Sequence, residues 1–351
     1  MSNDLEFKTV NDHEWSVFQS GRGSFYQSVE RMKAWQEIGR DTFLLGVYQN
    51  NELKIGAVIT AKNGHFVIAD GPVFDEYDRA VFDKFLSGVI EFTKSKKAID
   101  LQIFPEILAS TYLYEEIDEE KPNQAADIVK VFQDAGFVYF GRGRANNPKN
   151  KVVNPQNFVK DLLGITNDEE LWATYNTTTR RYLRKTSANL YAEKADSDKI
   201  KEVASVIDES NLKNGVASPD PGFYQSLFTN FGEKIEFWTV KSKIDDAIVA
   251  GGIFIFDEKE VSYYSGGSSQ KHLCLDGARF LQDFMLKRAL ELGYKRYNFL
   301  GFSTNNLLQF KNGFGGFIEE KIGGFEIVFQ KGILHKIISR IKTRTQPAKN
   351  S

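Results

Sequence analysis

The sequence predicts an α/β fold of the α+β type, with two tandem domains that each contain a mixed, twisted sheet with flanking helices. The chain has 351 residues, 41% of them hydrophobic and 26% charged, which suits two ordinary globular domains. A pattern of three strands, a helix and a further strand occurs twice along it, at nearly equal length. We expect a first domain over residues 1–150, a second over 151–330 and a basic C-terminal tail over 331–351.

The first copy of this pattern begins at Phe43. β-Branched and aromatic residues predict three strands up to Phe74, with turns at 49–51 and 63–64. A helix over 78–94 follows, because apolar residues recur there at i, i+3, i+4 and i+7. A short strand over 99–104 closes the unit.

The second copy begins at Ile235, after a helix predicted over 196–210. Three strands occupy 235–269, a helix 278–292 and a closing strand 294–300. This order of elements is the middle of the acyl-CoA N-acyltransferase (GNAT) fold. The repeat therefore predicts two GNAT-like domains side by side, joined by a polar loop over 144–156.

Composition excludes several classes of site. Lysine and arginine (45) nearly balance aspartate and glutamate (47), so a polyanionic partner must meet a local basic patch. The single Cys274 excludes an intrachain disulfide, and the four histidines show no ligand spacing, so we expect no metal and no cofactor. The N-terminus lacks a leader pattern, and no run of 18 apolar residues occurs. We expect a cytoplasmic protein.

The first candidate site lies in residues 297–316. A strand ends at a glycine, a polar loop follows, and Phe310 and Lys311 precede a glycine-rich turn. Ligands usually bind at the carboxyl ends of strands in an open sheet. Lys311 can present a fixed positive charge there to an anion or a developing oxyanion. The alternative is a surface loop with an exposed lysine.

The second candidate site is a basic stripe on a helix that Asn167 and Glu170 open with capping-box spacing. Further along the same helix, basic residues recur at i, i+4, and they are Arg180, Arg181, Arg184 and Lys185. Like charges at this spacing repel one another, but they suit the phosphates of a nucleotide or RNA. A merely solvated helix face is the alternative.

The third candidate site lies in residues 262–268. Strand alternation places Tyr263 and Tyr264 on opposite faces, and Gly266 and Gly267 allow the backbone to approach a ligand closely. Packing is the alternative role for the tyrosines. The stretches 74–79 and 270–278, where a CoA-binding loop would lie, lack paired glycines, which argues against acetyl-CoA as a donor.

The chain resembles the FemABX peptidoglycan bridge-forming aminoacyltransferases, in the short FemX-like form without a helical hairpin insertion. The matching stretches follow the family's order, and they are FYQS (25–28), GPVFD (71–75), TTRRYLRKT (178–186), YYSGGSS (263–269), ELGYKRYNFLG (291–301) and FKNGFGG (310–316). The resemblance implies transfer of an amino acid from aminoacyl-tRNA to the side-chain amine of the stem peptide. The acceptor would be UDP-MurNAc-pentapeptide or lipid II.

The resemblance also implies roles for individual residues. Lys311 would stabilise the oxyanion with Phe310 beside it, and the family's aromatic residue falls on Tyr263 or Tyr264. Residues that would bind the acceptor and its phosphates are Arg31 or Lys33, Lys213 and Asp75. Phe104 stands where the family often has an acid before a proline, and neither Asp75 nor Glu106 is favoured as its replacement in acid–base chemistry.

Two other functions remain open on this reading. One is a CoA- or acyl-carrier-dependent N-acyltransferase, and the other is a non-catalytic tandem-domain module that binds muropeptides or RNA. We expect a monomer. The C-terminal stretch predicts a basic amphipathic helix, which either rests on the inner membrane surface or packs its isoleucines on the protein.

Overall fold

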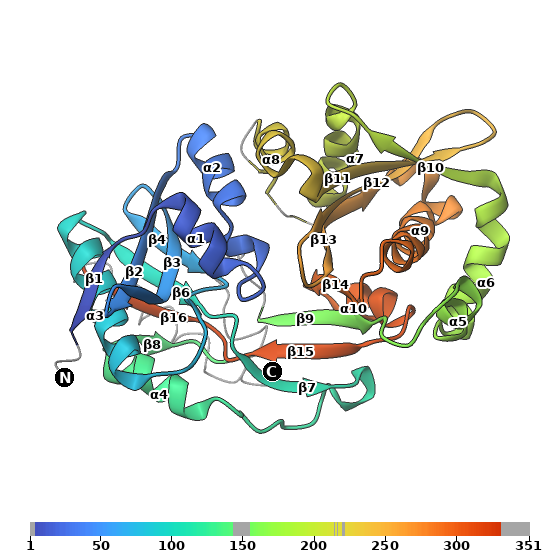
Figure 1. Ribbon diagram of the computed structural model, residues 1–351. Coiled ribbons are helices and arrows are strands. Elements are labelled where there is room, and N and C mark those ends of the chain that lie inside the picture. Colours follow the sequence, from blue (N-terminus) through green and yellow to red (C-terminus); the bar gives the residue numbers. More distant parts are fainter. Residues whose placement is uncertain (1–3, 143–154, 214, 216, 220–221, 331–351) are drawn as a thin grey trace, which may run out of the picture.

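A computed structural model describes residues 4–142, 155–213, 215, 217–219 and 222–330. It contains two sheets side by side, each with helices on both faces (Figure 1). The predicted boundary between residues 150 and 151 and the predicted tail over 331–351 lie outside the described residues.

The first sheet has eight strands, which are β1 (Leu5–Thr9), β2 (Asp41–Gln49), β3 (Glu52–Lys62), β4 (His65–Ala69), β5 (Val73–Phe74), β6 (Asp100–Phe104), β8 (Val138–Tyr139) and β16 (Phe325–Val328). Their order is β1-β2-β3-β4-β6-β16-β8, with β5 on β3. The sheet is mixed, because β4 and β6 are parallel and the other pairs are antiparallel. Helices α3 (Arg79–Ser95) and α4 (Ala126–Asp134) cover one face, and α1 (Asp12–Gln19) and α2 (Val29–Glu37) cover the other.

The second sheet also has eight strands, which are β7 (Leu108–Tyr112), β9 (Gln156–Asp161), β10 (Leu190–Ala195), β11 (Ile235–Ser242), β12 (Ile248–Phe256), β13 (Val261–Ser268), β14 (Arg296–Gly301) and β15 (Phe317–Lys321). Their order is β10-β11-β12-β13-β14-β9-β15-β7. One face packs on α5 (Asp168–Ala173), α6 (Thr177–Thr186), α9 (Gly277–Glu291) and α10 (Asn305–Asn312). The other face packs on α7 (Ile200–Lys213) and α8 (Phe223–Phe231).

Each sheet borrows one strand from the other half of the chain. Strand β7 comes from the first half and pairs with β15 at the edge of the second sheet. Strand β16 comes from the end of the described chain and inserts between β6 and β8 of the first sheet. A buried ion pair stabilises this exchange of strands. Lys321 Nζ lies 2.9 Å from Asp70 Oδ1, and both side chains are buried. The two halves are therefore tied together by strand pairing and by a buried ion pair.

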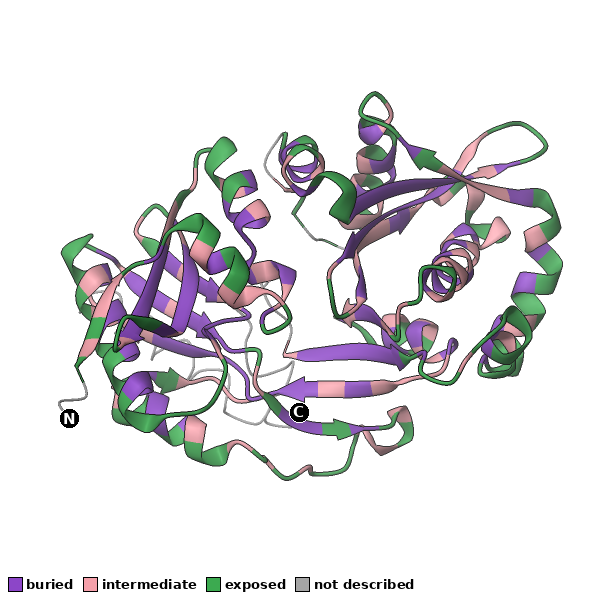
Figure 2. Ribbon diagram, in the orientation of Figure 1, coloured by how far each residue is buried: buried purple, intermediate pink, exposed green. Residues whose placement is uncertain are grey.

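Aromatic packing joins the two halves across α2 and α8. Trp35 stacks on Phe223 with ring centroids 4.2 Å apart, and Phe25 meets Tyr264 edge-on at 5.7 Å. Figure 2 shows that the strands of both sheets are mostly buried while the outer helix faces are exposed. The first half meets the second half along residues 25–40, 70 and 106. We call this line of contact the seam.

The repeated unit is confirmed in both halves, since β2–β4, α3 and β6 correspond to β11–β13, α9 and β14. The prediction of a single helix running from Asn167 through Lys185 is wrong. Helix α5 ends at Ala173, and Asn176 starts α6 by accepting a hydrogen bond from the backbone N–H of Thr179. The break forms because the backbone N–H of Asn176 donates to the carbonyl of Gly313, so the chain turns onto the glycine-rich segment.

Candidate active site

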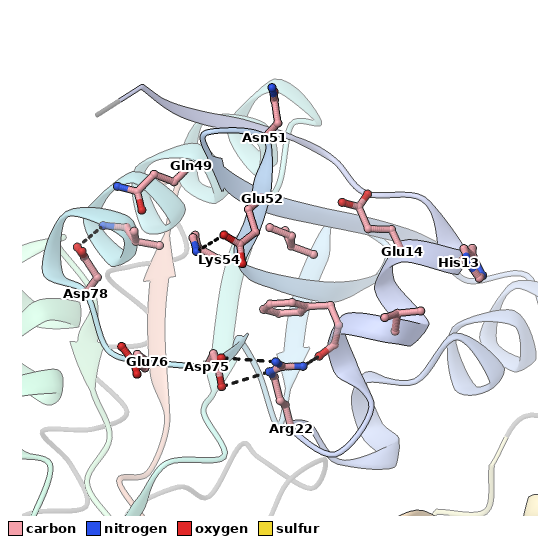
Figure 3. Close-up of a pocket in the computed structure, with 14 residues that line it drawn as sticks. His13, Glu14, Arg22, Gln49, Asn51, Glu52, Lys54, Asp75, Glu76 and Asp78 are labelled. Carbon is pink, nitrogen blue, oxygen red and sulfur yellow. Dashed lines mark hydrogen bonds and ion pairs between the residues drawn. The ribbon is translucent and has the colours of Figure 1, made fainter. Parts of the chain in front are cut away.

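The first half has a surface hollow of about 660 Å³ that contains one predicted site residue, Asp75. Figure 3 shows Asp75 paired with Arg22, whose Nε lies 3.3 Å from Oδ1 of the carboxylate. Every residue that lines this hollow belongs to the segment between His13 and Val81. Asp75 therefore lies in a hollow made by the first half alone, while Lys311 packs against strand β14 of the second.

The second sheet contains an opening between two parallel strands, which we call the wedge. Strands β13 and β14 pair only at Val261–Tyr297 and Ser262–Asn298, although β13 runs on to Ser268 and β14 to Gly301. The corresponding strands of the first half, β4 and β6, are paired along their whole length. Only the second of these two strand pairs separates, and it does so at the carboxyl ends, where ligands bind in open sheets.

Lys311 lies at the base of the wedge. Its Nζ donates to the carbonyl oxygens of Phe299, Leu300 and Gly301 at 2.5, 3.0 and 2.6 Å. These carbonyls belong to the part of β14 that does not pair with β13. The lysine therefore supplies the hydrogen-bond donors that a paired strand would have supplied. The side chain is buried, and burial lowers the pKa of its ammonium group to about 7. Lys311 is thus an internal residue of α10, not part of an exposed loop.

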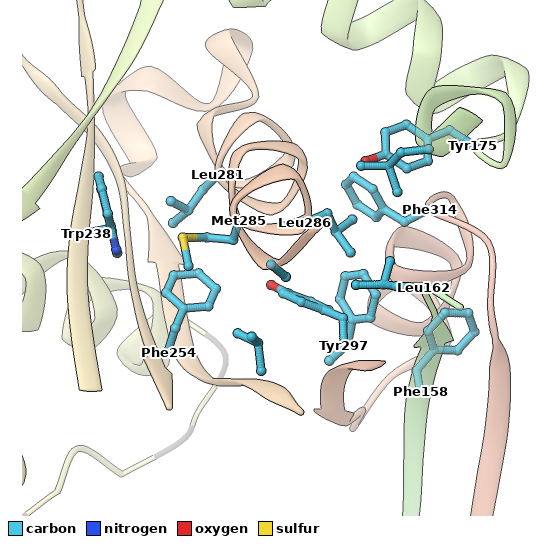
Figure 4. Packing of buried hydrophobic residues seen from close by; sticks show 14 of the residues in the cluster. Phe158, Leu162, Tyr175, Trp238, Phe254, Leu281, Met285, Leu286, Tyr297 and Phe314 are labelled. Atoms are coloured by element: carbon cyan, nitrogen blue, oxygen red, sulfur yellow. The ribbon is translucent and has the colours of Figure 1, made fainter. Parts of the chain in front are cut away.

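A second buried lysine, Lys160 on β9, holds the glycine-rich turn that follows Lys311. Its Nζ donates to Thr174 Oγ1 at 2.6 Å and to the carbonyl of Phe314 at 2.8 Å. Phe314 and Tyr175 pack together in the core beside this turn (Figure 4). Burial lowers the pKa of Lys160 to about 8. No motif surrounds Lys160 in the sequence, and its partners are distant in the chain, so sequence reasoning missed it.

The two tyrosines of β13 face opposite sides of the second sheet. Tyr263 stacks on Phe254 on the α9 side, with centroids 5.3 Å apart, while Tyr264 packs against Phe25 in the seam. The strand has a bulge here, because the register with β12 shifts between Ile253 and Phe254 and leaves Tyr264 without a partner. Burial raises the pKa of both hydroxyls.

The neighbouring glycines allow close approach within the protein itself. A Cβ on Gly266 would lie 2.0 Å from the Tyr263 hydroxyl oxygen, and one on Gly267 would lie 2.6 Å from the Val206 carbonyl of α7. No side chain fits at either position without displacing these groups.

Arg31 lies among aromatic rings of the first half at the seam. The Arg31 guanidinium lies 4.1 Å from the centroid of Tyr26 and 5.5 Å from that of Trp35, and its Nη1 is buried without a hydrogen-bond partner in the described residues. Lys33 points elsewhere, since its Nζ lies 3.3 Å from Asp12. Lys213 is exposed at the end of α7. Of the two predicted first-half cations, Arg31 is the one buried at the seam.

Glu106 follows the carboxyl end of β6 and is a group that the sequence reading did not favour. Its side chain is exposed, yet desolvation is the largest influence on its carboxyl group and raises the pKa to about 8. The charge of Lys321 opposes this increase, while Asp70 and Glu260 reinforce it. Charges from both halves therefore act on this carboxyl group. The sequence feature that could have identified Glu106 is its position just after the end of a predicted strand.

The basic stripe of α6 lies on the side of the second half away from the seam. Arg181, Arg184 and Lys185 are exposed, and Arg180 is half-buried. In the part of the chain that the structure describes, none of the four forms an ion pair. Within α6 itself every charged residue is basic. The stripe therefore carries uncompensated positive charge.

Comparison with known proteins defines the class of protein first. The fold matches the crystal structure of FemX with a TM-score of 0.74 at 16% identity, over 95% of this chain and 99% of that one. It also matches a tandem GNAT protein from the clavulanic acid biosynthesis pathway, with a TM-score of 0.55 at 9% identity over 93% and 98% of the two chains. The predicted pair of GNAT-like domains is confirmed.

The family follows from the sequence. The model of the FemAB family matches residues 9–247 and 239–342, and the chain belongs to this family. The aminoacyltransferase FemB of Staphylococcus epidermidis is 39% identical over 85 residues, which are 22% of this chain and 20% of that protein. The chain thus matches about a fifth of the length of this curated relative.

The described residues contain neither a membrane-spanning helix nor a metal-binding cluster. No helix there is both long and apolar enough to cross a membrane. No cluster of three or more histidine, cysteine, aspartate or glutamate side chains there has the arrangement of a metal site.

Proposed function

We propose that this chain is an aminoacyltransferase that moves an amino acid from aminoacyl-tRNA to the side-chain amine of a peptidoglycan stem peptide. The acceptor is UDP-MurNAc-pentapeptide or lipid II. The observation that carries the proposal is the wedge, with Lys311 at its base, in a member of a family whose matched relative is named an aminoacyltransferase.

The chemistry exchanges an ester for an amide, so it needs neither ATP nor a metal. The neutral amine attacks the ester carbonyl, the tetrahedral intermediate collapses, and the ribose oxygen leaves with a proton. Glu106 takes the proton from the amine on this proposal, because its pKa of about 8 makes its ionised form, a minor fraction at neutral pH, a stronger base than an ordinary carboxylate. Lys311 stabilises the oxyanion by exchanging one of its three carbonyl contacts for the new negative charge.

The two substrates approach from different sides on this proposal. The acceptor occupies the seam, where Arg31 offers a buried guanidinium to its anionic groups and Lys213 offers an exposed charge. The RNA of the donor lies along α6, whose uncompensated positive charge suits a phosphate backbone. The reacting ends meet at the wedge.

Asp276 disfavours the alternative of a CoA-dependent N-acyltransferase. In that class of enzyme a diphosphate binds where the main helix begins, and here Asp276 directly precedes α9 and binds Arg279 at 2.6 Å. A carboxylate at this point repels a diphosphate.

Incubation of the protein with mixed charged tRNAs and UDP-MurNAc-pentapeptide tests the proposal by product mass. We expect a product heavier by one aminoacyl residue, and the mass identifies the amino acid. A parallel reaction with lipid II shows which acceptor is used. Lys311→Met should lower turnover about 10²–10³-fold, whereas the exposed control Lys271→Met should not. Transfer from acetyl-CoA, or full turnover by Lys311→Met, would contradict the proposal.

Contact between residues 331–351 and anionic lipid is part of the same proposal, because a lipid-linked acceptor lies at the membrane. Sedimentation with anionic vesicles should fall when the residues after 332 are removed. Equal sedimentation of both forms would contradict this contact.

A further inference from the structure

Three side chains from three helices form one continuous stack beside Lys311. The guanidinium carbon of Arg279 lies 5.3 Å from the ring centroid of Tyr182 and 5.1 Å from that of Phe310. Tyr182 belongs to α6, Arg279 to α9 and Phe310 to α10. The outer member, Tyr182, is 39% exposed, and the inner member, Phe310, directly precedes Lys311. The stack therefore leads from solvent to the residue next to the base of the wedge.

The middle layer of this stack is fixed in place. Arg279 Nε lies 2.6 Å from Asp276 Oδ2, and its Nη1 donates to Thr179 Oγ1 at 3.0 Å. Thr179 is itself completely buried on α6, and a Cβ on Gly313 would lie 2.3 Å from its hydroxyl oxygen. Two guanidinium nitrogens, Nε and Nη1, are thus hydrogen-bonded, which fixes the group between α6 and α10 within 5.3 Å of both ring centroids.

The same helix supplies the charge that surrounds the exposed ring. Arg180, Arg181, Arg184 and Lys185 flank Tyr182 on α6, and none has an ion-pair partner within the described residues. Arg181 also lies over the Tyr182 ring at 5.4 Å, but it is exposed and is free to turn toward a phosphate. An exposed aromatic ring among unpaired cations matches single-stranded nucleic acid, which stacks its bases on rings and places its phosphates on basic side chains.

We propose that Tyr182, backed by Arg279 and Phe310, is the stacking site for the last unpaired base of an RNA 3′ end. The inference deepens the proposed function and rests on it for one point, which is that the ribose of this nucleotide carries the ester. A base on the outer face of Tyr182 extends the stack by one layer. Its ribose then lies between the α6 cations and the wedge.

The local connections keep this site in register with Lys311. The backbone N–H of Asn176, at the start of α6, donates to the carbonyl of Gly313 just after α10 at 3.0 Å. Lys160 holds the following turn through Phe314. Lys160 also binds Thr174, just before α6, so the starts of α6 and of the turn after α10 are held together and a base bound at Tyr182 has a fixed position relative to the wedge.

Binding of uncharged RNA tests the site without any catalytic step. The probes are an RNA hairpin with a short single-stranded 3′ tail and the same hairpin with a blunt end, and binding is followed by fluorescence anisotropy. The wild-type protein should prefer the tailed hairpin about tenfold, within the range that stacking of one base supplies. Tyr182→Ala should lose this preference, and Tyr182→Phe should keep it because the ring remains.

Tyr77→Ala is the matched control, because Tyr77 is exposed to a similar extent, 43%, on the first half. It should leave the preference for the tailed hairpin unchanged. The inference is wrong if Tyr182→Ala retains the preference, or if Tyr77→Ala loses it equally.

The outcome separates this inference from the proposed function. A wild-type protein that binds the tail through Tyr182 but transfers no amino acid overturns the proposed function and supports the RNA-end site. A protein that transfers the amino acid, with the same KM for charged tRNA in Tyr182→Ala as in the wild type, overturns the site and leaves the function intact.

Discussion

The buried ammonium of Lys311 makes the stability of the fold depend on pH, and Lys311→Met should remove that dependence. Burial lowers its pKa to about 7 in the folded protein, against roughly 10.4 in an unfolded chain. Below pH 7 the lysine is protonated in both states, so the folded state carries the full cost of the buried charge. Between about pH 7 and 10.4 the unfolded chain binds the proton more tightly, so the free energy of unfolding rises with pH.

The pKa difference sets the size of this effect. It corresponds to an increase of up to roughly 5 kcal/mol in the free energy of unfolding across the interval. The carbonyls of Phe299, Leu300 and Gly301 stabilise the ammonium form and reduce the increase, so this figure is an upper bound.

Urea denaturation followed by tryptophan fluorescence, repeated from about pH 6 to 10.5, measures the effect. The free energy of unfolding of the wild type should rise relative to that of Lys311→Met as the pH increases. Lys160 has a lowered pKa in both proteins, so the comparison isolates Lys311. The exposed control Lys271→Met should follow the wild type. Parallel curves for the wild type and Lys311→Met would refute the reasoning.

Three further perturbations test other parts of the structure. Glu106→Gln should lower kcat/KM by about 10²–10⁴-fold and remove the acid limb of the bell-shaped pH–rate profile, because the wild type needs both an ionised Glu106 and a protonated Lys311. Lys321→Met should cost about 3–5 kcal/mol in urea denaturation by leaving Asp70 buried without its partner, and Asp70→Asn in the same chain should recover part of that loss. Gly316→Ala should cost roughly 1–3 kcal/mol and lower the thermal midpoint, because φ is +156° and the new Cβ would lie 2.3 Å from the Val159 carbonyl.

The repeated unit was predictable from sequence because its signals are local. Alternating β-branched residues, turn residues and a helical apolar period each report on a few neighbouring positions. The opposite faces of Tyr263 and Tyr264 followed from strand alternation in the same way, and the structure confirms them. The capping role of Asn167 was also local, and its side chain accepts from the N–H of Glu170.

The features that were missed depend on pairing between distant segments. The exchange of β7 and β16 between the sheets has no local signal, because either strand pattern fits any open edge. The break before Asn176 depends on the Gly313 carbonyl, 137 positions further on. Lys311 was singled out from the sequence, but its burial was not predictable, because its carbonyl partners become available only where β13 separates from β14.

The two copies of the repeat differ at the corresponding pair of parallel strands, which separates only in the second half. In the first half, β4 and β6 pair at every residue from His65–Asp100 to Ala69–Phe104, so no chain or ligand can enter between them. In the second half the same strands part after Ser262, and Lys311 satisfies the carbonyls that are left. The opening between parallel strands is therefore confined to the second half, while Glu106 and Arg31 of the first half lie along the seam.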